Sequence, residues 1–418
     1  MKQTLLILTA ALSLPFAAAQ TGTLAPAFGD TLNLKTPLNV RDLNRDTFYK
    51  VIVPLARKEG SLTLYNFAAS FPPLWKEVVI PRFQQKYGIK VNFYDTTSDV
   101  ADQQLVAAHR AGQSAPTDVY FAPGGKAGFY KASGVLANLP LYALLPEARL
   151  YQKAAATSAV GVQHGGSFMP FHRNQTAIAY NSALVKAADV PRTFPALLAW
   201  AKKNPGKLAI TSALKGGSGG GFAMSAASAL MGASCKAQFM DQSVTADAAA
   251  QWVKTSGCLN STWTYLKAIN GLSEVTNGNN DTYNLIANNA ASMGTVWEDG
   301  VYTYVQRRQL PDSVRLTLLS PGEVGGGDGL FVTADAPHPA AAMLFIDFAL
   351  SADIQTWKLE NMASRSVRLG IGSDKITGKN AQNLLPGNLY PKFSLSWPAD
   401  AMQVAFRDAY AAQVLGGR

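Results

Sequence analysis

The chain has 418 residues, of which 48% are hydrophobic and 15% charged, a composition that indicates large apolar cores and excludes a disordered protein. Its length exceeds what one hydrophobic core normally serves, so we expect two domains. The formal net charge of +10 is spread along the sequence without a long run of Lys and Arg. This distribution predicts no nucleic-acid partner, although it favours weak attraction to anionic membranes or ligands.

The N-terminus has the three parts of a secretory signal peptide in the right order. Lys2 supplies a positive charge, Leu5–Phe16 is an apolar stretch too short to span a bilayer, and Ala17–Ala19 provides small residues for cleavage. We therefore expect residues 1–19 to be removed before Gln20, rather than to form a buried N-terminal helix. Since no Cys follows the apolar stretch to carry a lipid anchor, we expect an exported, unlipidated protein in the periplasm or elsewhere outside the cytoplasm.

The sequence contains two cysteines, Cys235 and Cys258. In an exported protein a pair of cysteines usually forms a disulfide, whereas two free buried thiols are the alternative. We therefore predict a Cys235–Cys258 disulfide.

Residues 20–59 are expected to form an N-terminal extension, irregular at first because Gly, Thr, Pro and Asn dominate it. Its last part, Asn44–Lys58, has apolar residues at helical spacing and predicts a helix. From Ser61 onward, short strands alternate with helices. The expected elements are a strand at 61–65, a helix at 73–87 interrupted by Pro81, a strand at 89–93, a helix from the cap Ser98 to about His109, and a strand at 118–121.

The alternation continues after Asn181. We expect a helix at 194–203, a strand at 208–211, a glycine-rich loop at 216–221 before a helix that ends near Met231, later strands at 295–297 and 316–319, and a short glycine-rich loop at 325–329. Such alternation is typical of βαβ units, so the predicted fold class is α/β with mainly parallel sheets.

Open parallel sheets bind ligands beyond the carboxyl ends of their strands. This rule selects Tyr65 and Asn66 after the first strand, Thr96 and Thr97 after the second, and the turn Gly124–Lys126, with Gly125 and Lys126, after the third. These positions are candidates for ligand contacts.

Aromatic residues also stand near the expected strand ends. Trp297 ends the strand at 295–297 and is followed by Glu298 and Asp299, while Phe71 and Trp75 follow the first strand closely. A planar ring is a good platform for a sugar, a heteroaromatic ring or a cationic amine. Core packing is the competing interpretation, which we consider weaker for Trp297 than for Trp75.

An enzymatic alternative is a secreted serine hydrolase. Gly216–Gly220 matches the G-x-S-x-G motif with Ser218 as nucleophile, His164–Gly166 lies where an oxyanion loop could be, and His338 follows in the hydrolase order. The density of glycines makes a chance match easy, and the preceding strand is expected to end near Thr211 instead of running into the first glycine. His338 stands at an expected helix start and is typical of a surface capping residue.

The same glycine-rich loop has a second functional interpretation. Backbone N–H groups of Ser218, Gly219 and Gly220 at a helix N-terminus could bind a carboxylate, phosphate or sulfate, or a neutral polar ligand. A purely structural turn is an equal alternative.

The sequence gives little support for a bound metal. Asp328 or the pair Glu298–Asp299 could hold a cation, although loop carboxylates are more often only solvated. The four histidines, His109, His164, His172 and His338, lack the spacing of metal ligands.

Five segments, in this order, together resemble the family 1 extracellular solute-binding proteins of bacterial ABC importers. The resemblance covers about residues 60–360, and Phe194 stands where the family usually has Trp. The segments are Phe83–Val91, Pro116–Ala122, Thr176–Asn181, Pro191–Phe194 and His338–Ser351.

The resemblance implies a two-lobe fold of the periplasmic-binding-protein type II, with mainly parallel sheets and a ligand cleft between lobes that close by a hinge motion. It implies residues 60–175 and 322–358 for lobe 1, and residues 176–321 and 359–418 for lobe 2. The residues that it places at the cleft are Tyr65, Asn66, Gly124, Gly125, Lys126, Asn174, the loop 216–221 with Ser218, Gly219 and Gly220, Trp297 and Glu298.

The function that the resemblance implies is capture of a small molecule and delivery to an ABC transporter permease, by a monomer without enzymatic activity or cofactor. Within the family, the chain is most similar to polyamine, thiamine and ferric-ion binders. It lacks the adjacent tyrosines of ferric-ion binders and an evident acidic tetrad for a polyamine. The ligand class therefore stays open between a thiamine-like or polyamine-like cation, a sugar and an oxoanion.

Overall fold

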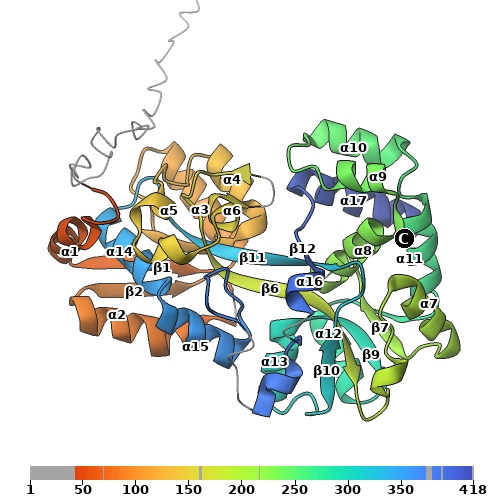
Figure 1. Cartoon of the computed structure of the whole chain (residues 1–418). Coiled ribbons are helices and arrows are strands. Elements are labelled where there is room, and N and C mark those ends of the chain that lie inside the picture. Colours follow the sequence, from red (N-terminus) through yellow and green to blue (C-terminus); the bar gives the residue numbers. More distant parts are fainter. Residues whose placement is uncertain are drawn as a thin grey trace, which may run out of the picture.

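Figure 1 shows two groups of helices and strands joined by the long strands β6 and β11. This computed structural model describes residues 43–68, 70–159, 162–215, 217–372, 379–386 and 389–416. The expected signal peptide, its cleavage site and residues 20–42 of the expected extension lie outside these ranges. We refer to the group at the left of Figure 1, which contains β1–β3, as the first half, and to the group at its right, which contains β7–β10, as the second half.

The first half begins with the helix α1 and ends with the short strands β4 and β5, and α14 and α15 return to it later in the chain. Its elements are α1 (Phe48–Glu59), β1 (Ser61–Asn66), the π-helical segment η2 (Leu74–Val79), α2 (Ile80–Tyr87), β2 (Lys90–Asp95), α3 (Ser98–Arg110), β3 (Val119–Pro123), η3 (Gly124–Lys126), α4 (Ala127–Ala132), α5 (Leu141–Leu144), η4 (Glu147–Leu150), α6 (Lys153–Thr157), β4 (Ser158–Ala159), β5 (Val162–Gln163), α14 (Pro339–Ala349) and α15 (Ala352–Met362).

The second half contains the remaining helices and the strands that extend the sheet. Its elements and the crossing strands are β6 (Met169–Asn181), η5 (Ala187–Asp189), α7 (Phe194–Lys203), β7 (Leu208–Thr211), α8 (Gly217–Leu230), α9 (Ala233–Phe239), α10 (Ala246–Thr255), α11 (Asn260–Asn270), β8 (Glu274–Thr276), α12 (Asn279–Ala287), β9 (Met293–Trp297), α13 (Glu298–Gln306), β10 (Val314–Thr317), β11 (Glu323–Val332), η7 (Lys379–Asn383), α16 (Tyr390–Phe393), β12 (Ser394–Leu395) and α17 (Asp400–Gln413).

One sheet runs through both halves in the order β2-β1-β3-β11-β6-β9-β7-β8. The pairs β1–β2 and β1–β3 are parallel, as are β7–β8 and β7–β9, which confirms the predicted α/β class and the parallel pairing within each half. The crossing strands pair antiparallel. The first part of β6 pairs with β11, and its second part, Thr176–Tyr180, pairs with β9. The sheet is therefore mixed, and its antiparallel centre is where the two halves meet.

Each half has its own buried apolar core. In the first half, Trp75 is fully buried, stacks on Phe171 with 4.9 Å between ring centroids, and packs against Phe121 and Phe345. Trp75 is thus a core residue, one of the two interpretations that its sequence position allowed. In the second half, the largest core cluster gathers side chains of β7, α7, α8, α11 and α17. The C-terminal helix α17 therefore stabilises the second half.

The helix predicted at 44–58 forms as α1 and packs on α14. It buries Phe48, Ile52 and Ala56 in the core of the first half, and the Tyr49 hydroxyl donates a hydrogen bond of 2.7 Å to Asp347. The last part of the expected extension is therefore built into the first half.

The predicted glycine-rich loops are wrong in both places. Gly217–Gly221 are the first residues of α8, and residues 325–329 lie inside β11. Glycine is required here by close packing: a Cβ on Gly219 would lie 1.8 Å from the carbonyl oxygen of Thr211, and a Cβ on Gly327 would lie 2.6 Å from the carbonyl oxygen of His172. These glycines bring backbone segments together and do not form turns.

Two smaller capping predictions are also wrong. The cap of α3 is Thr97, whose side chain accepts a hydrogen bond from the Val100 N–H, so Ser98 is the first helical residue. The His338 side chain makes no capping bond. Its ring lies 3.1 Å from the buried carboxylate of Asp118, which also accepts the His338 backbone N–H.

The predicted disulfide between Cys235 and Cys258 is confirmed. It joins α9 to the turn between α10 and α11, with 5.7 Å between the Cα atoms and a sequence separation of 23. Within the described residues, no helix is long and apolar enough to cross a membrane. The same part of the chain contains no cluster of three or more His, Cys, Asp or Glu that could hold a metal ion.

Removal of the disulfide should destabilise the second half without changing its fold. In the chain-entropy model, a crosslink over a loop of this size stabilises by about 3 kcal/mol, because it restricts the unfolded chain. We expect the double variant Cys235→Ser, Cys258→Ser to lose about that free energy of unfolding in urea titration. The wild-type protein measured with a reductant is the matched control, and equal stability with and without the crosslink would contradict the prediction.

Candidate ligand-binding site

A cavity of about 490 Å³ lies between the two halves, above the crossing strands. One wall comes from the first half, including Gln152 and Ser158, and the opposite wall comes from Met240, Gln242 and Trp397 of the second half. Residues of both β6 and β11 line the cavity as well. A cavity that both halves share is the natural candidate for the ligand site of a two-lobe protein.

Gly325, Gly326 and Gly327 of β11 expose bare backbone to this cavity. The Cβ atoms that larger residues would carry have no room. At Gly325 a Cβ would lie 2.4 Å from the side-chain oxygen of Gln175, and at Gly326 it would lie 2.8 Å from the indole nitrogen of Trp397. The glycine run therefore lets neighbouring side chains and a ligand approach the strand closely.

Arg173 of β6 lines the cavity beside this glycine run, since it pairs with Gly327 across the ladder. Its Nε atom is buried without a hydrogen-bond partner, and among the described residues no acidic side chain pairs with its guanidinium. An arginine that lacks a protein partner next to a cavity is suited to bind a carboxylate or phosphate group.

Asp328 of β11 contributes the acidic group of the cavity. Its carboxylate accepts a 3.2 Å hydrogen bond from the Gly124 N–H. Desolvation by the surrounding protein, and then the nearby charge of Asp299, raise the pKa of Asp328 to about 7. Desolvation also raises the pKa of Asp299 to about 6, although the Asn174 side chain and the Gly300 N–H oppose the shift. Near neutral pH, Asp328 is therefore only partly ionised, whereas Asp299 is mostly ionised.

His172, next to Arg173, is buried and uncharged. Its Nδ1 atom lies 2.7 Å from the hydroxyl of Ser364, and its Nε2 atom lies 3.8 Å from Asp299. Burial, and then the nearby Lys358, lower the pKa of His172 to about 3. His172 thus offers polar contacts to the site without a positive charge.

The strand-end residues predicted in the first half make their contacts within the protein. Asn66 is fully buried between Trp75 and Asp95, and Lys126 forms ion pairs of 2.8 Å with both Asp99 and Asp102. Tyr65 is partly buried and packs edge-on against Tyr94. Gly125 is exposed in η3, beside the turn whose Gly124 N–H bonds to Asp328. As ligand contacts, these residues stay predictions.

Ser218 is fully buried near the N-terminus of α8. Its hydroxyl lies 2.7 Å from the side-chain oxygen of Asn279 and 3.1 Å from the hydroxyl of Thr211. The histidines proposed for a hydrolase bond elsewhere: His164 accepts backbone N–H groups of its own loop, and His338 pairs with Asp118. This geometry does not support a serine hydrolase. Gly219 and Gly220 are also buried, and their role in anion binding stays a prediction.

In the second half, Trp297 lies near the cavity, whereas Glu298 is buried and paired with another residue of the protein. The Trp297 ring is half-buried, and its centroid lies 6.5 Å from that of Trp397, which lines the cavity. Glu298 is fully buried in a bidentate ion pair with Arg365, with N–O distances of 2.5 and 2.7 Å, and accepts the Leu385 N–H. Asn174 places its side chain near Asp299.

The sequence reasoning missed Arg173 and Trp397 as cavity residues. The position next to Asn174, which the resemblance placed at the cleft, is a signal that could have identified Arg173. Trp397 lies in the last fifty residues, where the pattern of strands and helices gives no position for a site.

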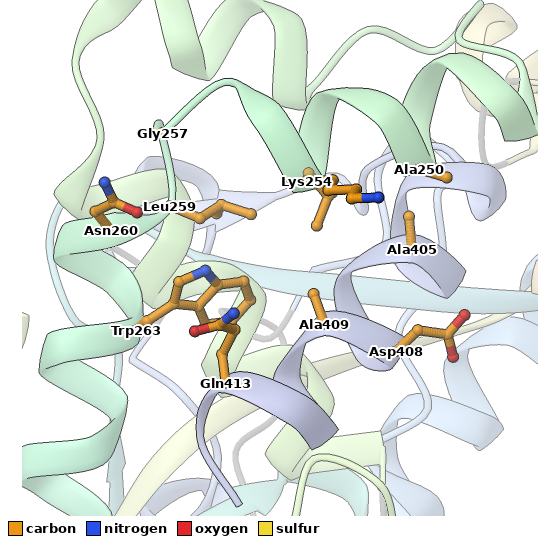
Figure 2. A pocket seen from close by; sticks show the side chains of 11 residues that line it. Ala250, Lys254, Gly257, Leu259, Asn260, Trp263, Ala405, Asp408, Ala409 and Gln413 are labelled. Carbon is orange, nitrogen blue, oxygen red and sulfur yellow. The ribbon is translucent and has the colours of Figure 1, made fainter. Parts of the chain in front are cut away.

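A second cavity, of about 370 Å³, lies wholly within the second half between α10, α11 and α17 (Figure 2). Trp263 and Leu259 form its apolar side, and Lys254 and Asp408 stand at its rim. It is separate from the crossing strands, so closure of the two halves would not enclose it.

Comparison with known proteins agrees with this architecture. The model of the bacterial extracellular solute-binding protein family matches residues 68–356. No curated protein matches the chain.

Several solved structures share the fold. Iron-bound HitA from Pseudomonas aeruginosa is 17% identical with a TM-score of 0.58, and 85% of this chain covers 99% of that one. The spermidine/putrescine ABC transporter substrate-binding protein PotD from Streptococcus pneumoniae is 12% identical with a TM-score of 0.61, over 85% of this chain and 98% of that one. AfuA from Actinobacillus pleuropneumoniae, with fructose 6-phosphate bound, is 14% identical with a TM-score of 0.56, over 85% and 99%.

The two-half fold, the cavity at their junction and the family match together identify the class. The chain belongs to the bacterial extracellular solute-binding protein family. It is therefore an extracellular solute-binding protein, as the sequence motifs predicted, and no finding supports the hydrolase alternative.

The ion pair Glu298–Arg365 should contribute strongly to stability, because loss of one partner leaves the other charge buried. We expect Glu298→Gln to cost about 3–5 kcal/mol of unfolding free energy. Glu360→Gln, at an exposed position of α15, is the matched control and should change stability little. Equal melting temperatures of the two variants would show that Glu298 is not held in this pair.

Proposed function

We propose that this protein binds a small solute with an anionic group, a carboxylate or a phosphate, in the cavity between its halves. The observation that carries the proposal is the Arg173 guanidinium, which borders the cavity without an acidic partner among the described residues. A charged group left without a partner in a partly desolvated site is costly, so a ligand that supplies the opposite charge gains from pairing with it.

The other charges near the cavity favour an anion over a cation. The raised pKa of Asp328, about 7, leaves the carboxylate that lines the cavity only partly ionised near pH 7. A net charge of +10 would also attract an anionic solute over long distance. Of the open ligand classes, an oxoanion or a sugar that carries an acidic group fits best, and a polyamine-like or thiamine-like cation fits least.

In this proposal, the ligand binds between the two lobes that the family resemblance implied. With lobe 1 at 60–175 and 322–358 and lobe 2 at 176–321 and 359–418, the crossing strands β6 and β11 lie at the hinge and the cavity lies at the junction. A ligand that contacts Arg173 from one side and Trp397 from the other would stabilise the closed form. The closed form is then presented to the permease, and no chemical turnover takes place.

The proposed route to this site is export. The signal peptide 1–19 is cleaved before Gln20, and the chain is released unlipidated as a monomer into the periplasm or its equivalent. N-terminal sequencing of exported material tests the cleavage site, and radiolabelled lipid on the chain would contradict the release.

Loss of the Arg173 charge should abolish the preference for anions. We expect Arg173→Gln to weaken binding of citrate, benzoate and inorganic phosphate by at least about tenfold, because a charge-assisted hydrogen bond is lost. Titration calorimetry measures the affinities, and a thermal-shift screen that includes spermidine and glucose tests the ligand class.

Arg149→Gln is the matched control, since Arg149 is exposed and does not line the cavity. Tight binding of spermidine by the wild type, with no anion bound, would refute the proposal. Unchanged anion affinity in Arg173→Gln would also refute it.

Anion binding should weaken as the pH rises through about 7. Asp328 has a raised pKa of about 7, so it is mostly neutral at pH 6 and negative at pH 8, where it would repel an anion in the same cavity. Asp299 adds to the same trend at slightly lower pH, and His172 stays neutral because its pKa is lowered to about 3.

Sulfate is a suitable probe because its own charge does not change over the pH range of the titration. Asp328→Asn should flatten most of the pH dependence and raise sulfate affinity at pH 8, whereas Asp189→Asn, at an exposed position, should leave the profile unchanged. A wild-type affinity that is constant from pH 5.5 to 8.5, or that rises with pH, would contradict a role for Asp328.

A further inference from the structure

A C-terminal segment, residues 389–397, passes the junction of the two halves and forms part of the cavity wall. We call it the C-terminal strap. It follows the region that the family model matches, which ends at residue 356. Its strand β12 pairs parallel with the start of β11, and both Ser396 and Trp397 line the cavity.

The strap is held in place by specific contacts. The Ser394 hydroxyl donates a 2.6 Å hydrogen bond to the side-chain oxygen of Gln175 on β6, and the Gln242 amide donates one of 3.1 Å to the Trp397 carbonyl oxygen. The residues that follow, Pro398 and Ala399, are buried before α17 begins. Trp397 is therefore fixed to a crossing strand on one side and to the second half on the other.

The Trp397 indole is placed to contact a ligand. It is half-buried, its Nε1 edge lies against Gly326, and its ring lies near that of Trp297. No described residue accepts a hydrogen bond from its Nε1–H. An aromatic ring with a free N–H at a cavity wall offers both a flat surface and a donor.

Arg173 and Trp397 both line this cavity. Arg173 pairs with Gly327 across the ladder, and Trp397 packs on the preceding residue, Gly326. An anionic group held by Arg173 would leave the rest of the solute inside the cavity that the Trp397 ring lines. The cavity of about 490 Å³ is much larger than a single oxoanion needs, so it has room for a solute that extends beyond its anionic group.

We infer that Trp397 is a specificity-determining residue, which selects anionic solutes whose body carries a flat ring over solutes of the same charge without one. The inference rests on the proposed anion site at Arg173. It assigns a ligand-selecting role to the strap, a segment outside the family match.

The test uses pairs of probes that share one anionic group. Phenyl phosphate is compared with methyl phosphate, and benzoate with acetate, by titration calorimetry of the full-length mature protein at pH 6. The measured quantity is the ring preference, the ratio of the two affinities within a pair. Aromatic stacking predicts a ring preference of about three- to tenfold in the wild type, which Trp397→Ala should reduce to about one.

Two further variants separate an effect on ligand selection from an effect on folding. Trp397→Phe keeps a flat face and should retain most of the ring preference. Gly326→Ala adds a methyl group where the indole edge now lies, so it should displace the ring and lower the preference without removing it. Trp252→Ala, a tryptophan of α10 that does not line the cavity, is the control and should leave the ratio unchanged. Melting temperatures check that each variant is folded.

The outcomes distinguish the two proposals. If no anion binds to the wild type, or if Arg173→Gln leaves all four probes unaffected, the anion site itself is wrong. If Arg173→Gln weakens all four probes but Trp397→Ala and Gly326→Ala keep the wild-type ring preference, the anion site stands and the role of Trp397 is refuted.

Discussion

The antiparallel ladder between β6 and β11 is the interaction on which the rest of the structure depends. It places β3 and the parallel strands of the first half on one side, and β9 with the parallel strands of the second half on the other. Because the same two strands run through both halves, a rotation between the halves must be absorbed by these strands and by the segment that carries Arg365. The residues at this ladder, including Arg173 and Asp328, would sense such a rotation directly.

The glycine run of β11 has a cost and a use in this arrangement. Glycine weakens a strand, since it loses more conformational entropy and packs no side chain. In return, the bare backbone admits the side-chain oxygen of Gln175 beside Gly325 and the indole edge of Trp397 beside Gly326. A Cβ at Gly326 would collide with the indole, so the glycine run allows the Trp397 wall of the cavity to approach the strand closely.

Much of the fold could be predicted from local patterns, because the strands at 61–66, 208–211 and 293–297 and the helix at 194–203 are set by their own periodicity. The glycines at 217–221 and 325–327 could not, since short-range rules treat glycine as a sign of a turn. Their real reason is close contact with residues of other elements, such as Thr211 of β7 for Gly219 and Gln175 of β6 for Gly325. A propensity argument has no access to that information.

The candidate site was predictable to a similar extent. The strand-end rule led to the neighbourhood of the cavity, because Gly124 bonds to Asp328 and Trp297 packs near Trp397. It could not show that Lys126 and Glu298 are already paired with charges of the protein, since those partners come from other elements. Nor could it show which strand residues line the cavity, because the register of β11 on β6 shifts between Asp328 and Gly329.

The position of the C-terminal strap has a consequence for the order in which the protein becomes functional. The crossing strand β11 ends at Val332, yet one wall of the cavity is supplied by Trp397, close to the end of the chain, and α17 docks on α10 just after it. A chain synthesised from its N-terminus therefore has its crossing strands before its cavity is complete. At the proposed site, solute capture can begin only after synthesis has passed Trp397.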